Sequence, residues 1–427
     1  MNMKELKEEL NRHLTEDILP FWMGLTDVRN GGFYGEVSSE GVIDKNADKG
    51  CILNSRILWT FSQSYIRYGK KEYLKTAAQA YRQLREVFSD KEFGGVYWSV
   101  RYDGTPADTV KHTYNQAFAL YGLCAYYEAT KDEEALELVL GLYELIEDKC
   151  RDEIGYLEGF DRQWKLAGND KLSENGVEAY RTMNTLLHIF EAYTELYRVT
   201  GSKKAGKELL FMIRLITDKI YAPDRHRLDV FFDRDYNSII DLQSYGHDIE
   251  AAWLIERGLN VLQYGRPYMT KGNVGTVAED DRCFDISVMS VTDEDDVAAI
   301  MRLRSILDDL TTTVYERAYE NGLLYNECEN GTVDTGHIWW AQCEAMIGFM
   351  NGYGHESDRA DYYDAVTAIW TTIKERYIVK AGTLQGREWY WGIDKNGMTD
   401  TVNPIAGMWK CPYHNSRMCM ELIDRFK

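Results

Sequence analysis

The chain has 427 residues, of which 44% are hydrophobic, so it can build a large core and is not expected to be disordered. Its formal net charge of −20 would repel phosphate backbones and anionic membranes, so neither nucleic acid nor a membrane is an expected partner. No signal peptide or membrane-spanning run is visible, and the eight cysteines form no Cys-x-x-Cys pair. We therefore expect reduced thiols, a cytoplasmic location and no structural metal site.

Apolar residues recur at helical spacing along most of the chain, which contains only six prolines. This pattern predicts twelve helices in six pairs, near residues 3–20, 51–68, 71–88, 112–129, 132–149, 181–200, 203–221, 247–263, 296–319, 337–353, 358–377 and 414–426. No linker rich in proline, glycine or serine divides the series, so we expect one catalytic domain over residues 1–427.

Short aromatic stretches with glycine lie between the helix pairs and alternate in the manner of hairpin strands. They occur at residues 31–37, 94–100, 155–161, 228–233, 322–328 and 387–394. Six helix pairs with β excursions at one end indicate an all-α fold, a single (α/α)6 barrel in which six inner helices surround a funnel. Residues 264–295 are the least regular stretch, and both a lid over the funnel and a surface insert are open interpretations.

Polar and aromatic residues that are unusual inside helices gather at the start of every second helix, whereas the intervening helices have ordinary amphipathic patterns. These clusters lie at residues 52–59, 111–118, 181–193, 245–253, 337–345 and 411–418. Asn184 and His188 share a helical face, as do Trp340 and Glu344. A lone histidine on an apolar helix is more often a hydrogen-bonded core residue, but six equivalent clusters predict one shared pocket.

Histidine suits proton transfer at neutral pH because its ordinary pKa is about 6.5. Two histidines on opposite sides of a carbon could deprotonate one face and reprotonate the other, which is the minimum machinery for epimerisation beside a carbonyl. His247 and Glu250 share a helical face, so the carboxylate could hold the imidazole in its working tautomer. Arg56, a charge in an apolar helix start, could stabilise the developing oxyanion.

The remaining histidines and motifs add little to this site. His13, His226 and His355 lie on terminal or polar stretches, and we expect them on the surface without a role. His112 and His337 are expected to support helix ends. No Gly-rich phosphate loop or dinucleotide fingerprint is present, so no cofactor is expected.

Two other functional classes stay open on the residues alone. A glycoside hydrolase on the same toroid would need two opposed carboxylates, for which Glu250, Glu344 and Asp161 are candidates. A sugar-binding protein without catalytic activity would use the histidines only to bind hydroxyl groups. Deuterium uptake from solvent at C2 of a reducing sugar separates these two classes from an epimerase.

Ordered motifs over nearly the whole chain resemble the N-acylglucosamine 2-epimerase superfamily, and within it the cellobiose 2-epimerase family. They lie at residues 47–59, 106–115, 160–164, 173–176, 182–188, 244–253, 339–344 and 409–421, and include SYGHDIEA and CPYHN. The resemblance implies an (α/α)6 barrel that epimerises C2 of the reducing-end glucose of β-1,4-linked disaccharides. Cellobiose would give glucosyl-mannose and lactose would give epilactose, through a cis-enediolate.

The resemblance also implies roles for individual residues. His247 and His414 match the acid/base pair, and His188 matches a residue that assists at O1 together with Arg56. Positions that bind or orient the sugar match Asn184, Glu250, Trp340 and Trp409. Residues 264–295 look longer than the family's usual connection, which leaves the non-reducing sugar open. Two alternatives for the reaction stay open, namely mannobiose as the substrate and an aldose–ketose isomerisation. The sequence also leaves open which histidine serves which face of C2. It does not determine the oligomeric state, for which a monomer is one option.

Overall fold

The fold is known from a computed structural model, which describes residues 1–168, 171–172, 175–265, 293–355, 359–379 and 386–425. Its helices are α1 (Met3–Arg12), α2 (Leu19–Gly24), α3 (Cys51–Tyr68), α4 (Lys71–Gln83), α5 (Thr113–Thr130), α6 (Glu133–Leu145), α7 (Met183–Thr200), α8 (Lys203–Leu215), α9 (Tyr245–Tyr264), α10 (Glu294–Ala318), α11 (Trp339–His355), α12 (Ala360–Thr372) and α13 (Tyr413–Arg425). None of these described helices is both long and apolar enough to cross a membrane.

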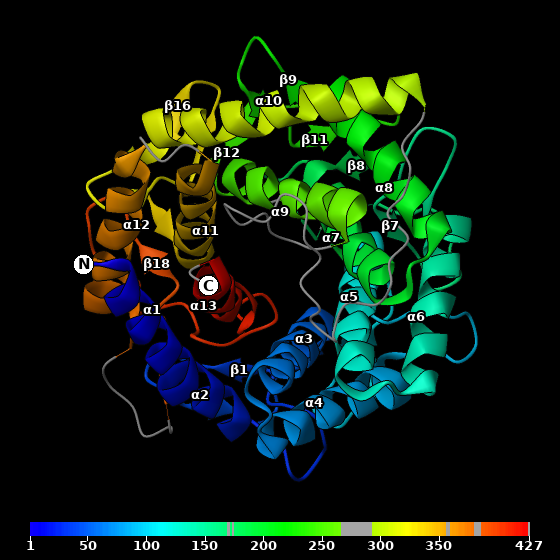
Figure 1. Cartoon of the computed structure of the whole chain (residues 1–427). Helices are drawn as coiled ribbons and strands as arrows, with labels where there is room; N and C mark the ends of the chain where they lie inside the picture. The colour runs from blue at the N-terminus through cyan, green and yellow to red at the C-terminus, as the bar shows by residue number, and fades with distance from the viewer. Residues whose placement is uncertain (169–170, 173–174, 266–292, 356–358, 380–385, 426–427) are drawn as a thin grey trace.

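Two concentric rings of helices make up the molecule (Figure 1). In the inner ring, α3, α5, α7, α9, α11 and α13 pack in that order, and α13 packs back onto α3. The outer ring consists of α1, α4, α6, α8, α10 and α12, each of which packs on an inner helix. This is the predicted (α/α)6 barrel.

The burial of each helix explains its place in the barrel. Outer helix α4 buries Tyr73, Ala77 and Ala80 on one face, as expected for an amphipathic surface helix. Inner helix α5 is buried without a break from Thr113 to Tyr126, since it is covered on all sides. The predicted helix limits are confirmed to within two or three residues, with the outer helices α4, α6, α8 and α12 each continued by one π-helical turn.

The expected helix at residues 3–20 is observed as one continuous helical segment that extends to Gly24. α1 and α2 are joined by a π-helical turn at His13–Ile18, and the ring of His13 is buried. Its Nε2 accepts a hydrogen bond of 2.8 Å from the indole of Trp389, and its Nδ1 lies 2.9 Å from Asp17. The expectation that His13 lies on the surface is therefore wrong, because a distant tryptophan covers it.

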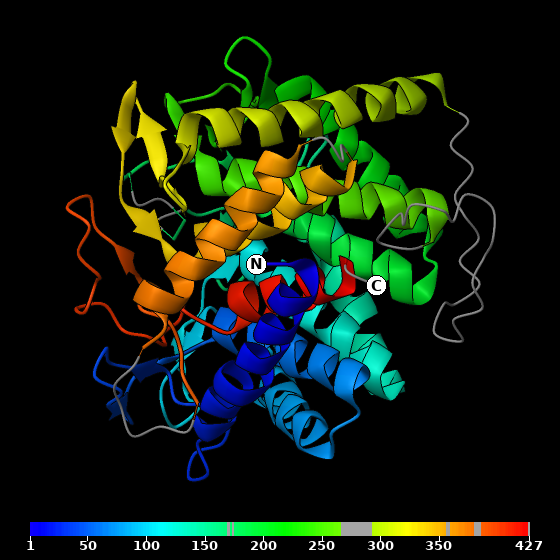
Figure 2. The ribbon, with the colours of Figure 1, turned by 60° about the vertical axis from the view of Figure 1, so that its left-hand side comes forward.

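Short antiparallel strands gather at one end of the barrel, on the left in Figure 2. They are β1 (Glu36–Val37), β2 (Ile43–Asp44), β3 (Lys49–Gly50), β4 (Ser99–Val100), β5 (Pro106–Asp108), β6 (Lys111–His112), β7 (Gly159–Phe160), β8 (Arg181–Thr182), β9 (Tyr221–Ala222), β10 (Arg227–Leu228), β11 (Phe231–Phe232), β12 (Leu242–Ser244), β13 (Tyr319–Glu320), β14 (Leu323–Leu324), β15 (Glu327–Glu329), β16 (Thr332–Asp334), β17 (His337–Ile338) and β18 (Gly392–Ile393). Each predicted β excursion contains at least one of these strands, although the observed strands are shorter.

The strands connect successive repeats into a rim. The strand that enters an inner helix pairs with a strand of the next repeat, as in β3 with β4, β6 with β7, β8 with β11, β12 with β15 and β17 with β18. A bridge between Val37 and Ala406 joins the last repeat to the first. The rim therefore closes around the same axis as the helices.

A buried cation stands two or three residues before several inner helices. The ammonium of Lys49 donates to Asp27 at 2.8 Å and to the carbonyl of Gly31 at 2.8 Å. Lys111 makes the same contacts with Asp90 and the carbonyl of Gly94 in the next repeat. Arg181 with Asp152 and Lys410 with Glu388 repeat the pattern. In each pair the carboxylate belongs to an earlier rim segment and the cation directly precedes an inner helix. The pair therefore attaches the rim to the start of that helix.

The other end of the inner ring is crossed by polar contacts between every neighbouring pair of helices. We refer to these contacts as the basal belt. They are Gln63 with Glu128, Glu128 with Arg198, Glu195 with Arg257, Glu256 with Asn351 and His355, Asn351 with Arg425, and Asp424 with Arg67. The inner helices are thus held together at both ends, by strands at one and by the basal belt at the other.

Candidate active site

A pocket of about 230 Å³ opens among the starts of the inner helices. All eight predicted site residues line it: Arg56, Asn184, His188, His247, Glu250, Trp340, Trp409 and His414. They come from α3, α7, α9, α11 and α13 and from the loop before α13. The predicted convergence of distant clusters on one pocket is observed, whereas the role of each residue stays a prediction.

His247 lies in the first turn of α9, where it contacts Trp340 with a ring-centroid distance of 4.7 Å. Gly246 permits this contact, since a Cβ there would lie 2.6 Å from the indole ring. The Nδ1 of His247 lies 2.8 Å from the hydroxyl of Ser244, which occupies the N-cap position without capping the helix. Burial lowers the pKa of His247 to about 4, so the ring is neutral at physiological pH.

The structure changes one sequence expectation about His247. Glu250 was expected to hold its tautomer, but the hydrogen-bond partner of Nδ1 is the hydroxyl group of Ser244. Glu250 instead accepts a hydrogen bond of 2.5 Å from Arg417 and acts on His247 through its charge, which opposes the effect of burial on the imidazole pKa. The reason is geometric: Glu250 lies one helical turn after His247, where its carboxylate meets the guanidinium of Arg417.

His414 lies in the first turn of α13 and contacts two tryptophans that line the pocket. Its ring centroid lies 5.6 Å from that of Trp340 and 5.4 Å from that of Trp339. Its Nδ1 lies 2.7 Å from Oε1 of Glu344. Burial lowers the pKa of His414 well below its ordinary value, as do the charges of Arg56 and Arg417. Burial raises the pKa of Glu344 to about 8, so this pair retains a proton at neutral pH.

His188 and Arg56 also line the pocket. The Nδ1 of His188 lies 2.9 Å from Glu191, and its ring meets Tyr114 edge-on at 5.1 Å. Arg56 donates to the hydroxyl of Tyr114 at 2.9 Å, and its guanidinium lies 4.2 Å from the centroid of Phe118. The Nε of Arg56 has no hydrogen-bond partner among the described residues, so the side chain can still donate to a ligand oxygen.

Two side chains in the pocket are suited to sugar binding. The Oδ1 of Asn184 is buried and has no hydrogen-bond partner within the described part of the chain. Trp409 is half-buried and meets Trp98 edge-on at 5.6 Å, an arrangement that fixes the plane of its ring. A free acceptor and a fixed aromatic face match the hydroxyl groups and the C–H face of a sugar ring.

A group of side chains that the sequence did not single out supports the histidines. Arg417, fully buried on α13, donates to Glu191 at 2.8 Å, to Glu250 at 2.5 Å and to Glu344 at 2.8 Å. A signal was available, because the spacing i, i+3 recurs in His188–Glu191, His247–Glu250 and His414–Arg417. Of these pairs, only His247–Glu250 was predicted from the sequence to act together.

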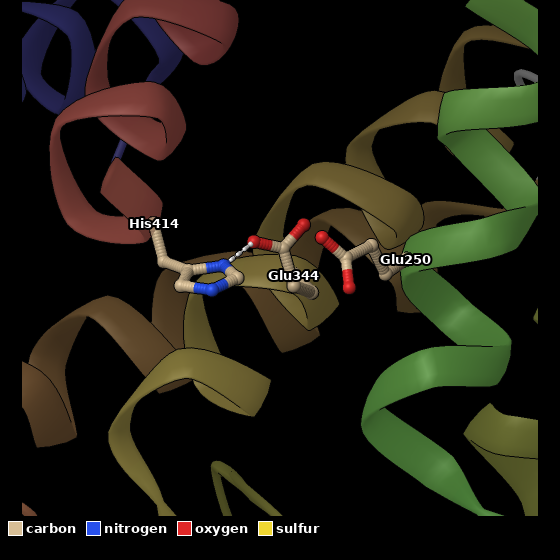
Figure 3. Close-up of side chains that lie close together, drawn as sticks. All are labelled: Glu250, Glu344 and His414. Carbon is tan, nitrogen blue, oxygen red and sulfur yellow. Dashed lines mark hydrogen bonds and ion pairs between the residues drawn. The ribbon is translucent and has the colours of Figure 1, made fainter. Parts of the chain in front are cut away.

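The carboxylates are arranged unlike those of a glycoside hydrolase. Glu250 and Glu344 both bind one guanidinium, and their oxygens lie within 4.8 Å of each other and of a nitrogen of His414 (Figure 3). Opposed catalytic carboxylates lie about 5 to 9.5 Å apart on either side of a sugar. Asp161 is not among the described residues that line the pocket, and its carboxylate accepts hydrogen bonds from its own turn.

Glu250, Glu344 and His414 also have the composition of a metal site. The cation between the two carboxylates in this structure is the guanidinium of Arg417. A metal ion would have to displace it and break the contact between His414 and Glu344. These residues therefore fit an internal ion-pair network better than a metal centre.

For the segment 264–295, a lid and a surface insert both stay open interpretations, because residues 266–292 lie outside the described part of the chain. The rest of the molecule defines a class of protein: an (α/α)6 barrel whose pocket combines three histidines with tryptophan faces suited to carbohydrate.

Known proteins share this architecture and much of the sequence. Residues 32–270 match the family model for N-acylglucosamine 2-epimerase. The cellobiose 2-epimerase of Eubacterium cellulosolvens is 44% identical over 97% of this chain and 98% of its own length, and that of Ruminococcus albus is 42% identical over 98% of each chain. The structure of the enzyme from Bacillus thermoamylovorans, 38% identical, superposes with a TM-score of 0.86 over 99% of this chain and 100% of its own. The chain therefore belongs to the N-acylglucosamine 2-epimerase family, in its cellobiose 2-epimerase branch, and is a carbohydrate isomerase.

Proposed function

We propose that the protein epimerises C2 of the glucose at the reducing end of β-1,4-linked disaccharides, turning cellobiose into glucosyl-mannose and lactose into epilactose. Relatives that align over almost the whole chain are cellobiose 2-epimerases. The observation that supports the mechanism is that His247 and His414, from different helices, contact the same indole of Trp340 inside one pocket.

In this mechanism the sugar ring opens and C2 loses its proton to the Nε2 of one histidine. The electrons form a cis-enediolate, whose oxygen at C1 accepts hydrogen bonds from Arg56 and His188. Rotation about the C2–C3 bond presents the other face of C2 to the second histidine, which returns a proton. The ring then closes, and one proton has moved from one imidazole to the other.

The different partners of the two histidines suggest their resting roles. His247 is neutral, and in the tautomer that donates Nδ1–H to the hydroxyl oxygen of Ser244 its Nε2 is unprotonated and acts as the base. His414 shares a proton with Glu344, whose raised pKa keeps that proton on the pair, so its Nε2–H is an acid. The roles interchange in the reverse direction. Asn184, Glu250, Trp340 and Trp409 bind or orient the sugar in this proposal.

Incubation with cellobiose, lactose and mannobiose in heavy water, followed by NMR of the products, tests the function. We expect a new disaccharide with a reducing-end mannose that carries deuterium at C2, while the unconverted substrate stays unlabelled at early times. A ketose product would indicate an isomerase, a new reducing end would indicate a hydrolase, and unchanged sugar would indicate a binding protein. Each of these three results would contradict the proposal.

Substitution of either catalytic histidine tests the mechanism. His247→Ala and His414→Ala should each lower kcat by about 100- to 10,000-fold, the usual contribution of a general acid or base. His226→Ala is the matched control, because that ring is half-exposed and bonded to Asp309. Near-native turnover in either pocket variant would exclude the two-histidine mechanism.

A further inference from the structure

Arg417 is the most connected charge next to the pocket, but it does not line the pocket itself within the described residues. It follows His414 by one helical turn on α13 and is fully buried. Its two terminal nitrogens reach carboxylates on three other helices, Glu191 on α7, Glu250 on α9 and Glu344 on α11. The guanidinium thus connects four of the six inner helices just beneath the site.

Two of these carboxylates are the partners of pocket histidines. Oε1 of Glu344 lies 2.8 Å from Arg417 and 2.7 Å from Nδ1 of His414, so one oxygen contacts both groups (Figure 3 shows the carboxyl and the imidazole). Glu191 lies 2.8 Å from Arg417 through Oε1 and 2.9 Å from Nδ1 of His188 through Oε2. Any change in the charge of Arg417 therefore acts directly on the hydrogen bonds that orient these rings.

We propose that Arg417 is a positioning residue that determines how firmly the His414–Glu344 pair holds its transferable proton. The proposal rests on the epimerase chemistry of His247 and His414 described above. It follows from the charges that meet here, since one buried guanidinium faces three buried carboxylates. Burial penalises the excess negative charge, which favours one bound proton among them.

The surroundings indicate where that proton resides. Glu191 receives hydrogen bonds from Tyr413 as well as contacts with Arg417 and His188, and these outweigh burial and hold its pKa at about 2. For Glu344, burial and the charge of Glu250 outweigh the contacts with Arg417 and Trp253 and raise its pKa to about 8. The proton therefore belongs to the Glu344–His414 hydrogen bond rather than to Glu191.

The charged and titratable groups that face this network come from all six inner helices. They are Arg56 of α3, Tyr114 and Tyr121 of α5, His188 and Glu191 of α7, His247 and Glu250 of α9, and Tyr413 and His414 of α13, together with Glu344 of α11. Burial keeps the pKa of the three tyrosines above its ordinary value. The tyrosines therefore stay neutral while the transferable proton is lost. The charges that act on this proton are those of the carboxylates and of Arg56 and Arg417.

The proton count predicts a pH dependence. Above about pH 8 the Glu344–His414 pair loses its proton and the enzyme has no acid, so kcat/KM falls. Arg417 lowers the proton affinity of both partners, because a positive charge within hydrogen-bond distance shifts a pKa by about 1 to 3 units. Removal of that charge should move the alkaline limb upward by about one pH unit or more.

The experiment measures kcat/KM for cellobiose against pH, with deuterium incorporation at C2 as the readout. Arg417→Met removes the charge and should move the alkaline limb to higher pH. Glu191→Gln removes a competing negative charge, which leaves more of the Arg417 charge acting on Glu344, and should move the limb to lower pH. The two opposite shifts separate an electrostatic role from a loss of packing. Glu191→Gln also serves if Arg417→Met does not fold.

Arg198→Met is the matched control, because Arg198 is mostly shielded from solvent, belongs to an inner helix and pairs with Glu128 and Glu195 in the basal belt. It should lower stability and leave the limb in place. A limb that stays at its wild-type position in both pocket variants, or that moves in the control, overturns the role of Arg417. A wild-type product without label at C2 overturns the epimerase chemistry instead, so the two failures are distinguishable.

Discussion

Each histidine in the pocket presents a different partner at Nδ1: a carboxylate of α7 for His188, a hydroxyl for His247 and a carboxylate of α11 for His414. With Nδ1 engaged in every case, the Nε2 atoms are the ones available to a ligand. The partners also differ in charge, since His247 meets a neutral hydroxyl whereas His414 meets a carboxyl group. The two histidines of the proposed mechanism therefore have different surroundings before a substrate binds.

Trp409 should contribute to substrate binding rather than to chemistry. Its ring is half-buried, lines the pocket and is held edge-on by Trp98. We expect Trp409→Ala to raise the KM for cellobiose about tenfold, equivalent to about 1.4 kcal/mol, and to leave kcat within about twofold of wild type. Steady-state kinetics of the variant measure both parameters.

Trp409→Phe provides the comparison, because it keeps an aromatic face in the same position. Its KM should lie between those of the wild type and Trp409→Ala. Equal KM values for all three proteins would exclude a stacking role for this residue.

At the scale of elements, the buried cations before the inner helices connect rim and barrel. The ammonium of Lys49 and the carboxylate of Asp27 are both buried, and the carboxylate pKa lies below its ordinary value, because the hydrogen bonds from Lys49 and Asn30 outweigh burial. Lys49→Met would leave Asp27 buried without its cation. We expect a loss of about 3–5 kcal/mol in the free energy of unfolding, measured by denaturant titration.

Lys45→Met is the control for this prediction. Lys45 is exposed, four residues away in the same hairpin region, and its substitution should change stability by less than about 0.5 kcal/mol. A similar small effect for Lys49→Met would mean that water or another donor replaces the ammonium.

The helices of this barrel were predictable because their signal is local. Tyr73, Ala77 and Ala80 show the outward-facing pattern of an outer helix within two turns of sequence. Strand pairing was not predictable in the same way, since β12 pairs with β15, which lies more than eighty residues later in the chain. A period-2 pattern identifies a strand but contains no information about its partner.

The candidate site shows the same division. Unusual residues at helix starts, such as His188 and His247, stood out against an apolar background. Arg417 did not, because a charged residue near a helix end is ordinary until three carboxylates from other helices are seen to meet it. His13 was misplaced for the same reason, since its partner Trp389 is 376 positions away.

At the scale of the molecule, the basal belt should make stability depend on pH through His355. Hydrogen bonds with Asp308 and Glu256 raise the pKa of His355 to about 9 in the folded protein. A raised pKa means that this contribution is complete below about pH 6.5 and is lost as the pH rises through about 9. Thermal unfolding of wild type and His355→Gln should therefore differ most near pH 6.5 and converge above 9.

The comparison with His355→Gln isolates this group from other residues that titrate over the same range. Because the ring is partly exposed, the difference in Tm should be modest and should shrink in high salt. A constant difference in Tm across the range would show that His355 contributes through packing alone.

The closed order of the inner ring has a consequence for how the enzyme becomes active. The helix that fits between α11 and α3 to complete the circuit also carries His414 and Arg417. In the proposed mechanism, a chain with five inner helices in place would have His247 but no second histidine, so it could not epimerise a sugar. Under that mechanism, turnover reports that the circuit has closed.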